Sequence, residues 1–244
     1  MFEHFSQRKF KLFVDFDGTI TKVDVGESIF LKFGDMDKVS GIIKRIDSGE
    51  LPGFLGWKEL FDTLSVIDEN ELNRLIDSIQ IDQSFNNLID FSKKYDIDLF
   101  ILSDGFDYYI NKILNRENMN GLKYYSNNLS FSEEGLLVPY FPFRDEECKD
   151  CANCKRNHII ENSGDDEFTI YVGNGSSDVC PAQYCDFIFA KDTLLKYCEK
   201  ERVSFSPYKT FDDVIVKLEA IVTKKRLKKR HQAELKRRTV YMQG

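Results

Sequence analysis

Residues 10–19 read FKLFVDFDGT, an apolar run that ends in two aspartates, a glycine and a threonine. The β-branched and aromatic content of residues 10–16 predicts a buried strand. Residues 98–103, 168–173 and 187–190 are equally short and apolar, and they are far enough apart for crossover connections. Strands of this kind are buried on both faces. We therefore expect an α/β fold with a doubly wound, mostly parallel, Rossmann-like sheet covered by helices.

Between the first strand and residue 98, apolar residues recur with the spacing of amphipathic helices. Asp68, with Glu71 three residues later, resembles a capping box that opens one of these helices. We therefore expect a small helical cap inserted after the first strand. Two further runs, 124–131 and 136–141, alternate as the strands of a β-hairpin do. The predicted division is a catalytic core at residues 1–22 and 84–222, a helical cap at 23–83 and a basic tail at 223–244.

The composition favours a folded, cytoplasmic protein. With 244 residues, of which 42% are hydrophobic and 14% aromatic, the chain can bury a sizeable core, which excludes disordered and collagen-like proteins. The sequence has no apolar run of about 18 residues, so no membrane-spanning helix is predicted. The N-terminal residues lack the apolar region of a secretion signal. The six cysteines are therefore expected to be reduced thiols or metal ligands rather than a disulfide framework.

The net charge of −7 conceals an uneven distribution. Residues 224–238 contain nine Lys or Arg residues and one acid, so the rest of the chain has 25 basic and 40 acidic residues. A helix over this segment is charged almost all round, and the favoured interpretation is a solvated extension. Contact with nucleic acid, another polyanion or a membrane surface is the second interpretation. Docking against the acidic body is the third.

Polar residues follow three of the predicted strands. Asp15 and Asp17 end the first strand, Ser103 ends the second, and Asn174 and Asp178 follow the third. In open α/β sheets, ligands bind outside the carboxyl ends of the strands, so we expect one site here. Carboxylates at positions i and i+2 point to the same side of a strand, which is costly unless a cation neutralises them. Oxygen ligands of this kind favour Mg²⁺.

Two further features suit an anion at this site. The Ser103 hydroxyl precedes a predicted helix and suits a phosphoryl oxygen, although an N-cap is its alternative role. Lys155 opens an amphipathic helix, where the helix dipole disfavours a cation, so a nearby anion would explain it. One aspartate can then attack phosphorus while the other handles the leaving-group proton. The alternative for the aspartate pair is a loop cap, and for the Gly-rich stretch 173–178 a structural turn.

DFDGT, Ser103, Lys155 and GNGSSD (173–178) stand in this order at the ends of successive strands. This set resembles the motifs of the haloacid dehalogenase superfamily of phosphatases. The cap after the first strand is similar to the C1 cap of its phosphoserine-phosphatase-like branch, subfamily IB. DFDGTIT, LSDGFDYYI, CANCK and FAKDTLLKYC are similar to the methionine-salvage phosphatases that act on 2-hydroxy-3-keto-5-methylthiopentenyl-1-phosphate. The same branch includes phosphoethanolamine and phosphocholine phosphatases.

The resemblance implies a role for each matching residue. Asp15 is then the nucleophile that forms an aspartyl-phosphate, and Asp17 protonates the leaving group and activates the hydrolytic water. The other implied ligands are Gly18, Thr19, Ser103, Asp104 and Lys155 for the phosphate, and Asp15, Asp17, Asn174 and Asp178 for Mg²⁺. The family usually has an acid where this chain has Asn174, so a weaker affinity for Mg²⁺ is expected.

Asp24 and Asp107 are candidates for substrate recognition. In the phosphoserine branch, an acid at the position of Asp24 contacts the substrate amine. A substrate with an amine or several hydroxyl groups is therefore one hypothesis. A solvated loop acid or a helix N-cap is the alternative role of each residue.

Three cysteines and a histidine are candidate zinc ligands: Cys148, Cys151, Cys154 and His158. Thiolate and imidazole groups at such spacing suit tetrahedral Zn²⁺. The CxxCxxC spacing is tight, however, so reduced thiols in a packed loop are favoured over zinc.

The function predicted from these features is Mg²⁺-dependent hydrolysis of a small phosphorylated metabolite, with the methionine-salvage enol phosphate as one candidate. The alternatives within enzymes are a phosphatase for phosphoserine, phosphoethanolamine or phosphocholine, and a phosphotransferase. The alternative from another class is a polyanion-binding protein that acts through the basic tail.

Overall fold

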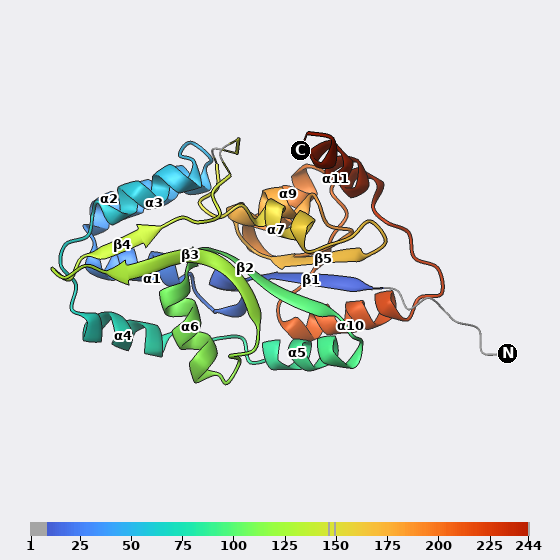
Figure 1. Ribbon diagram of the computed structural model, residues 1–244, viewed down its shortest axis with the longest axis horizontal. Helices are drawn as coiled ribbons and strands as arrows, with labels where there is room; N and C mark the ends of the chain where they lie inside the picture. The colour runs from blue at the N-terminus through green and yellow to red at the C-terminus, as the bar shows by residue number, and fades with distance from the viewer. Residues whose placement is uncertain (1–8, 146, 149, 244) are drawn as a thin grey trace. The chain divides into compact units, whose positions relative to one another are not determined.

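The computed structural model describes residues 9–145, 147–148 and 150–243. Its strands form one seven-stranded sheet in the order β4-β3-β2-β1-β5-β6-β7; Figure 1 labels the strands β1–β5. The strands are β1 Phe10–Asp15, β2 Asp98–Phe106, β3 Lys123–Phe131, β4 Leu137–Tyr140, β5 Phe168–Gly173, β6 Phe187–Ala190 and β7 Ser206–Pro207. The α-helices are α1 Val25–Phe33, α2 Met36–Asp47, α3 Gly53–Phe61, α4 Glu69–Ser78, α5 Phe85–Lys94, α6 Asp107–Arg116, α7 Lys155–Glu161, α8 Val179–Ala182, α9 Asp192–Lys200, α10 Phe211–Val222 and α11 His231–Gln243. The predicted α/β fold with helices inserted after the first strand is confirmed.

Several sequence predictions concern the environment of the chain. The predicted lack of a secretion signal depends mainly on residues 1–8, which lie outside the described residues. Within the described ranges, no helix has both the length and the apolar character that crossing a membrane requires. All six cysteines fall within these ranges, and none of them forms a disulfide bond with another described residue.

The chain divides into two compact units. The first unit contains the residues up to Val14, Asp82–Phe100 and the residues from Arg156 onward. The second contains Asp15–Ile81 and Ile101–Lys155. Helices α1–α4 therefore belong to the same compact unit as Ile101–Lys155, and the cap boundaries predicted at residues 23 and 83 stay a prediction.

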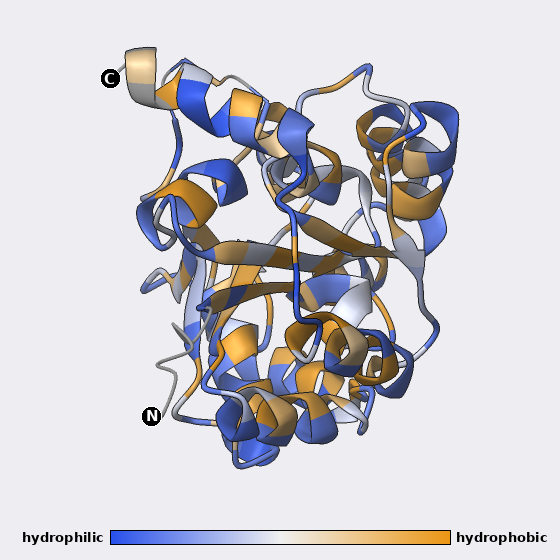
Figure 2. Ribbon diagram, turned by 90° about the vertical axis from the view of Figure 1, so that its right-hand side faces the viewer, coloured by the Kyte–Doolittle hydropathy of each residue, from blue (hydrophilic) through white to orange (hydrophobic). Residues whose placement is uncertain are grey.

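Parallel strands form the centre of the first unit. Val14 of β1 pairs with Val172 of β5, which in turn pairs with Phe189 of β6. All six residues of β5 are buried, the pattern expected of a strand that is covered on both faces. The strands are correspondingly apolar in Figure 2. Helices α5 and α10 pack together, and the ring centroids of Phe85 and Phe211 lie 5.0 Å apart between them.

The second unit combines the inserted helices with a hairpin. The predicted cap of α4 is present, because the Asp68 carboxylate accepts a hydrogen bond from the Glu71 N–H at 3.0 Å. Helices α1–α3 share an apolar core with the loop between α2 and α3; its buried members are Phe30, Val39, Ile42, Leu51 and Leu60. Strands β3 and β4 pair antiparallel, as predicted. Strand β2 runs to Phe106 instead of ending at Ser103, since the backbone remains extended at Phe106 (φ −124°, ψ 141°).

The basic tail is docked within the first unit, so its interpretation as a solvated extension is wrong. Arg237 of α11 is only 5% exposed, and its guanidinium lies 3.2 Å from the Asp186 carboxylate. The same guanidinium donates to the Tyr184 carbonyl at 2.6 Å, and Ala233 is fully buried. A buried carboxylate needs a cationic partner, and this need outweighs the solvation of one arginine in a highly charged helix.

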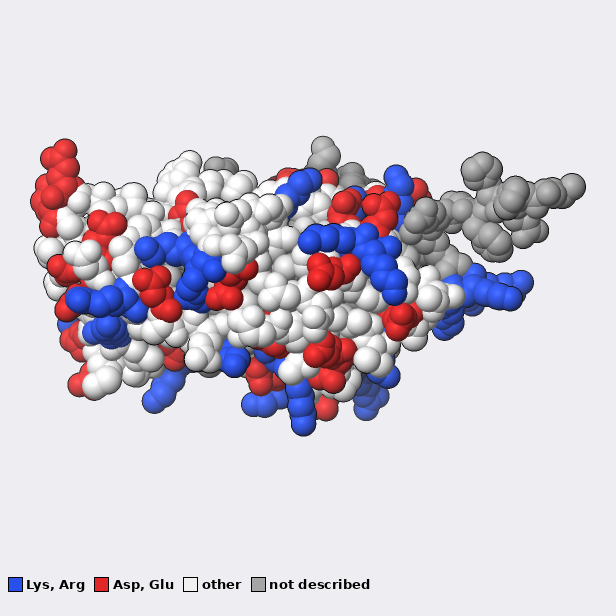
Figure 3. Space-filling model, turned by 90° about the horizontal axis from the view of Figure 1, so that it is seen from below, with Lys and Arg blue, Asp and Glu red and all other residues white. Residues whose placement is uncertain are grey.

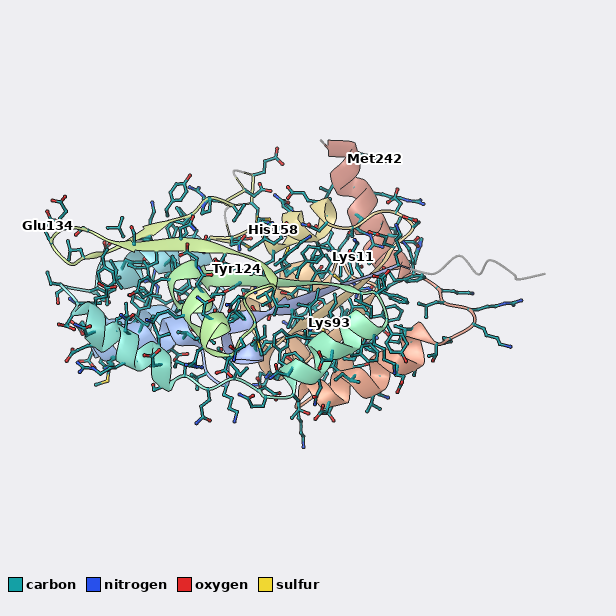
Figure 4. All side chains as sticks on the ribbon, turned by 60° about the horizontal axis from the view of Figure 1, so that its bottom comes forward. Lys11, Lys93, Tyr124, Glu134, His158 and Met242 are labelled. Atoms are coloured by element: carbon teal, nitrogen blue, oxygen red, sulfur yellow. The ribbon has the colours of Figure 1, made fainter. Side chains whose placement is uncertain are left out.

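The rest of the tail is more exposed. Residues 224–226 are exposed, and Lys and Arg side chains stand out at the right-hand edge of Figure 3, where the segment after α10 runs in Figure 1. Met242, which is 84% exposed, lies near the outer end of α11 (Figure 4). The tail is thus held through the inward-facing side of α11 and through Arg230, which precedes this helix and whose N–H donates to the Asp186 carboxylate.

Candidate active site

The chain turns sharply after β1, at the first predicted motif. Gly18 has φ +72°, a left-handed conformation that glycine adopts without steric cost. Its N–H donates to the Thr21 hydroxyl at 3.1 Å and to the Val23 carbonyl at 3.3 Å. Thr19 is buried beside it. The turn therefore fixes the backbone directly after Asp17.

Asp15 and Lys155 form a buried ion pair. The Lys155 ammonium lies 2.6 Å from one carboxylate oxygen of Asp15, and the two side chains are 2% and 6% exposed. Lys155 is the first residue of α7, as predicted. The pair sets a carboxylate that can act as a nucleophile directly against a cation that can bind a phosphoryl oxygen.

The Asp17 carboxylate accepts three hydrogen bonds. One oxygen accepts from the Val25 N–H, and the other accepts from the hydroxyls of Ser103 and Tyr109, each at 3.0 Å. The Ser103 hydroxyl also accepts from the Gly105 N–H at 2.9 Å. Ser103, predicted as a phosphate ligand, thus contacts the second aspartate in this structure.

The pKa of Asp17 is raised well above its usual range, mainly because the carboxyl is buried. The negative charges of Asp24 and Asp15 raise this pKa further. The pKa of Tyr109 is also raised, first by burial and then by the Asp17 charge, so the phenol keeps its proton and remains a donor. An aspartate with a raised pKa is suited to donate a proton.

Gly105 is required by close contacts. A Cβ at this position would overlap the Tyr109 hydroxyl and would lie 2.7 Å from the Asp17 carboxylate. Any other side chain here therefore has to displace the groups that surround Asp17.

Asp104 and Asn153 lock the loop after β2 to the segment before α7. The Asp104 carboxylate accepts from the Asn153 N–H at 2.8 Å and from the Trp57 indole N–H at 3.1 Å. The Asn153 amide donates to the carbonyls of Ser103 at 2.7 Å and Tyr125 at 3.1 Å. Asn153 is 1% exposed. Asp104 was predicted to be a phosphate ligand. In this structure, its carboxylate contacts groups that position the loop.

Three residues of this site were not predicted from the sequence: Trp57, Tyr109 and Asn153. They contact Asp104, Asp17 and Ser103 across sequence separations of 47, 92 and 50 residues. The only local signal is the position of Asn153 two residues before the predicted lysine.

The two predicted substrate residues lie in different surroundings. Asp24 is exposed and caps α1, because its carboxylate accepts from the Glu27 N–H at 2.8 Å. Asp107 lies at the start of α6 and accepts from the Asn128 amide at 2.7 Å and from the Leu129 N–H at 2.9 Å. Asp24 thus keeps one face toward solvent, whereas Asp107 ties α6 to β3.

The other predicted metal ligands belong to the first unit, at the carboxyl end of β5. Asp178 is fully buried, and its carboxylate accepts from the Tyr171 hydroxyl at 2.6 Å and from the N–H groups of Asn174 at 2.8 Å and Gly175 at 2.9 Å. A Cβ on Gly173 would lie 2.5 Å from the same carboxylate. The Gly-rich turn therefore wraps closely around one acid.

The predicted zinc ligands do not form a metal cluster among the described residues. Within residues 9–145, 147–148 and 150–243, no three or more His, Cys, Asp or Glu side chains lie together so that they could hold a metal ion. His158 is buried on α7 (Figure 4), and burial lowers its pKa to about 4. Its imidazole is therefore neutral at neutral pH.

Comparisons with known proteins agree with this architecture. Residues 10–204 match the protein family described as "Putative Phosphatase". The chain belongs to this family. A 2-hydroxy-3-keto-5-methylthiopentenyl-1-phosphate phosphatase of Bacillus cereus (strain B4264) is 30% identical to it over 87% of this chain and 97% of the relative. The corresponding phosphatase of Bacillus thuringiensis (strain Al Hakam) is 31% identical with the same coverage.

Solved structures show the same fold. A phospho-aspartyl intermediate analogue of phosphoserine phosphatase matches with a TM-score of 0.67 and 21% identity, over 87% of this chain and 99% of that one. A substrate-bound phosphoserine phosphatase matches with a TM-score of 0.66 and 22% identity, over 86% and 98%. The protein is thus a phosphatase with the haloacid dehalogenase fold, as its motifs predict.

Proposed function

We propose that this phosphatase hydrolyses a small phosphomonoester through an aspartyl-phosphate on Asp15. The observation that supports this proposal most directly is the buried pair of Asp15 and Lys155, 2.6 Å apart. Lys155 would bind a phosphoryl oxygen and oppose the charge that builds up in the transition state. The Asp15 oxygen would form the new bond to phosphorus as the bond to the leaving oxygen breaks.

Asp17 is proposed as the acid and then the base. Its raised pKa favours the protonated form, which gives its proton to the departing alkoxide. The resulting carboxylate then takes a proton from the water that hydrolyses the aspartyl-phosphate. The hydroxyls of Ser103 and Tyr109 would hold Asp17 in one orientation during both steps.

The residues present suit Mg²⁺. The carboxyl groups of Asp15, Asp17 and Asp178 and the Asn174 amide supply the hard oxygen donors that Mg²⁺ prefers. Burial raises the pKa of Asp17, and the charges of Asp24 and Asp15 raise it further; a divalent cation relieves this crowding of negative charge. Mg²⁺ usually binds one or two carboxylates together with water and substrate phosphate, so it needs no cluster of three acids. Asp15, the Asp17 carbonyl, Asp178 and the Asn174 amide are the proposed ligands. When bound, the ion would neutralise charge between carboxylate and phosphoryl oxygens.

The methionine-salvage enol phosphate is the proposed substrate, because relatives that are 30–31% identical over 97% of their length are named for it. Asp24 is the proposed substrate-recognition residue, since it is exposed whereas both Asp107 oxygens are occupied by β3. Phosphoserine, phosphoethanolamine and phosphocholine are the competing substrates.

The test is release of phosphate from these four compounds, with and without Mg²⁺ after treatment with EDTA. Asp15→Asn should abolish release, whereas Asp62→Asn, a matched change at an exposed acid, should leave it intact. Release that needs no metal, or that survives Asp15→Asn, would contradict the mechanism. Preference for a competing compound would correct the substrate alone, and phosphate transfer to an added alcohol would indicate a phosphotransferase. Loss of turnover with every compound would leave the polyanion-binding alternative to be tested with nucleic acid.

A further inference from the structure

A cavity of about 260 Å³ lies in the first unit, between the strands β6 and β7 and the segment that joins α10 to α11. Pockets for drug-sized ligands usually measure about 300–1,000 Å³, so this one suits a smaller molecule. Residues 186–189 line it along β6, and the lining does not include Ala190, which pairs with Gly173 at the carboxyl end of the strand. The catalytic residues follow the carboxyl ends of the strands, so this cavity is not part of the proposed active site.

Positive charge at this cavity exceeds negative charge. Lys228 and Arg230 line it from the tail, together with one acid, Asp186. The Asp186 carboxylate, however, is already bound by the Arg237 guanidinium, by the N–H and hydroxyl of Thr169 and by the Arg230 N–H. Lys228, Arg230 and Arg237 thus bring three positive charges to this region against the one negative charge of Asp186.

The Arg230 guanidinium is incompletely satisfied. One of its NH₂ groups donates to the carbonyls of Ala182 at 2.9 Å and Gln183 at 2.7 Å, which are neutral acceptors. Among the residues that the structure describes, its buried Nε–H has no hydrogen-bond partner. A buried donor without a partner costs free energy that a ligand can recover. Burial also lowers the pKa of this guanidinium, a further sign that water solvates the cation poorly.

The rest of the lining is largely apolar. Phe187, Ile188, Phe189, Phe205 and Ile221 line it together with two polar residues, Ser204 and Ser206. Phe187 and Phe205 are only half-buried, so a flat apolar group would cover aromatic surface that now contacts water.

We propose that this cavity binds a small organic anion, with its carboxylate or phosphate on Lys228 and Arg230 and its apolar body on the phenylalanine rings. The cations come from the tail, and the apolar surface comes from the strands β6 and β7 and the loop before β7. A bound anion would therefore contact both the tail and these strands, and would stabilise the docked position of α11.

The probes for a direct test are benzoate, benzyl alcohol and inorganic phosphate, which separate the charge from the apolar body. Titration calorimetry on the full chain should give measurable binding for benzoate and weaker binding for the other two. Arg230→Gln and Lys228→Gln should each weaken benzoate binding about tenfold or more, the loss expected for one hydrogen bond to a charged group. Arg238→Gln, at an exposed arginine of the same tail, should change nothing.

Lys228 makes the test robust, because it is exposed and its replacement should leave the tail docked even if Arg230→Gln releases it. Benzoate should also slow tryptic cleavage of the tail in the wild type and not in the Lys228→Gln protein. Equal affinity for benzoate in the wild type and in both variants would place the anion elsewhere and overturn the proposal. Equal binding of benzyl alcohol and benzoate, or no binding of benzoate at millimolar concentration, would do the same.

Discussion

The buried pair of Asp15 and Lys155 makes a prediction about stability as well as activity. Lys155→Met should destabilise the protein more than Asp15→Asn does. Without the lysine, the Asp15 charge is left beside Asp17, whose pKa it already raises. Without the Asp15 charge, Lys155 still has a second acid within electrostatic reach: burial raises the pKa of Asp104, and the Lys155 charge offsets part of that rise.

The expected size follows from the separation of the two charges. At 2.6 Å and an effective dielectric constant of about 20, their attraction is about 6 kcal/mol. Loss of hydration offsets much of this attraction, so removal of one partner from a buried pair usually costs about 3–5 kcal/mol. We expect Lys155→Met near the upper end of this range and Asp15→Asn near the lower end. The double variant should lose less than the sum, with a coupling of about 1–3 kcal/mol.

The assay is urea unfolding of the wild type, both single variants and the double variant, in EDTA and without phosphate so that no ligand replaces the missing charge. Phosphate release on the same samples should show that all three variants are inactive, while the double variant is more stable than the Lys155→Met protein. Additive losses would show that the two side chains do not interact as the structure places them. A larger loss for Asp15→Asn would refute the reasoning about Asp17.

Three further predictions concern single positions. Gly105→Ala should lower kcat/KM about a hundredfold, because a small misplacement of the reacting groups costs about that much. Gly121→Ala is the control, since nothing lies within 4 Å of its new methyl group, and it should leave kcat/KM unchanged. Equal values of kcat/KM for the two variants would argue against close contact between a Cβ at Gly105 and the groups around Asp17. His158, with an ordinary pKa of 6.5 that burial lowers to about 4, binds its proton more readily in the unfolded state. The contribution of neutral His158 to the free energy of unfolding is therefore complete above about pH 6.5 and is lost as the pH falls toward 4, by about 3 kcal/mol in all. Urea unfolding at several pH values should show that the His158→Phe protein lacks this part of the pH dependence. Arg237→Met should lower the free energy of unfolding by about 3 kcal/mol, whereas Arg238→Met, the control, should lower it by less than about 0.5 kcal/mol. If urea unfolding gives equally small decreases for both variants, the buried ion pair of Arg237 and Asp186 contributes little to stability.

The sheet could be predicted because its signals are local. β5 and β6 have the predicted bounds, and β1 differs by one residue, since each is an apolar run that ends at polar or glycine residues. Short runs rich in β-branched and aromatic residues favour a buried strand over a helix. The hairpin β3–β4 followed in the same way from alternating residues around a turn.

The contacts around the site could not be predicted in the same way. The partners of Asp17 and Asp104 come from distant parts of the chain, and a tyrosine, a tryptophan and an asparagine have many possible roles in a sequence. The tail shows a similar limit. Its charge predicts solvation, and only the fold reveals that Asp186 is buried where Arg237 reaches it.

The ion pair at Lys155 also bears on how the product leaves. In the proposed role of Lys155, a phosphate ion would compete with the enzyme's own Asp15 carboxylate for the buried ammonium group with which that carboxylate now pairs. Its binding free energy from Lys155 is therefore only the difference between the attraction of phosphate and that of Asp15 to this cation. An unpaired lysine would contribute its full attraction. We expect inorganic phosphate to inhibit weakly for this reason, so that turnover continues where phosphate is abundant.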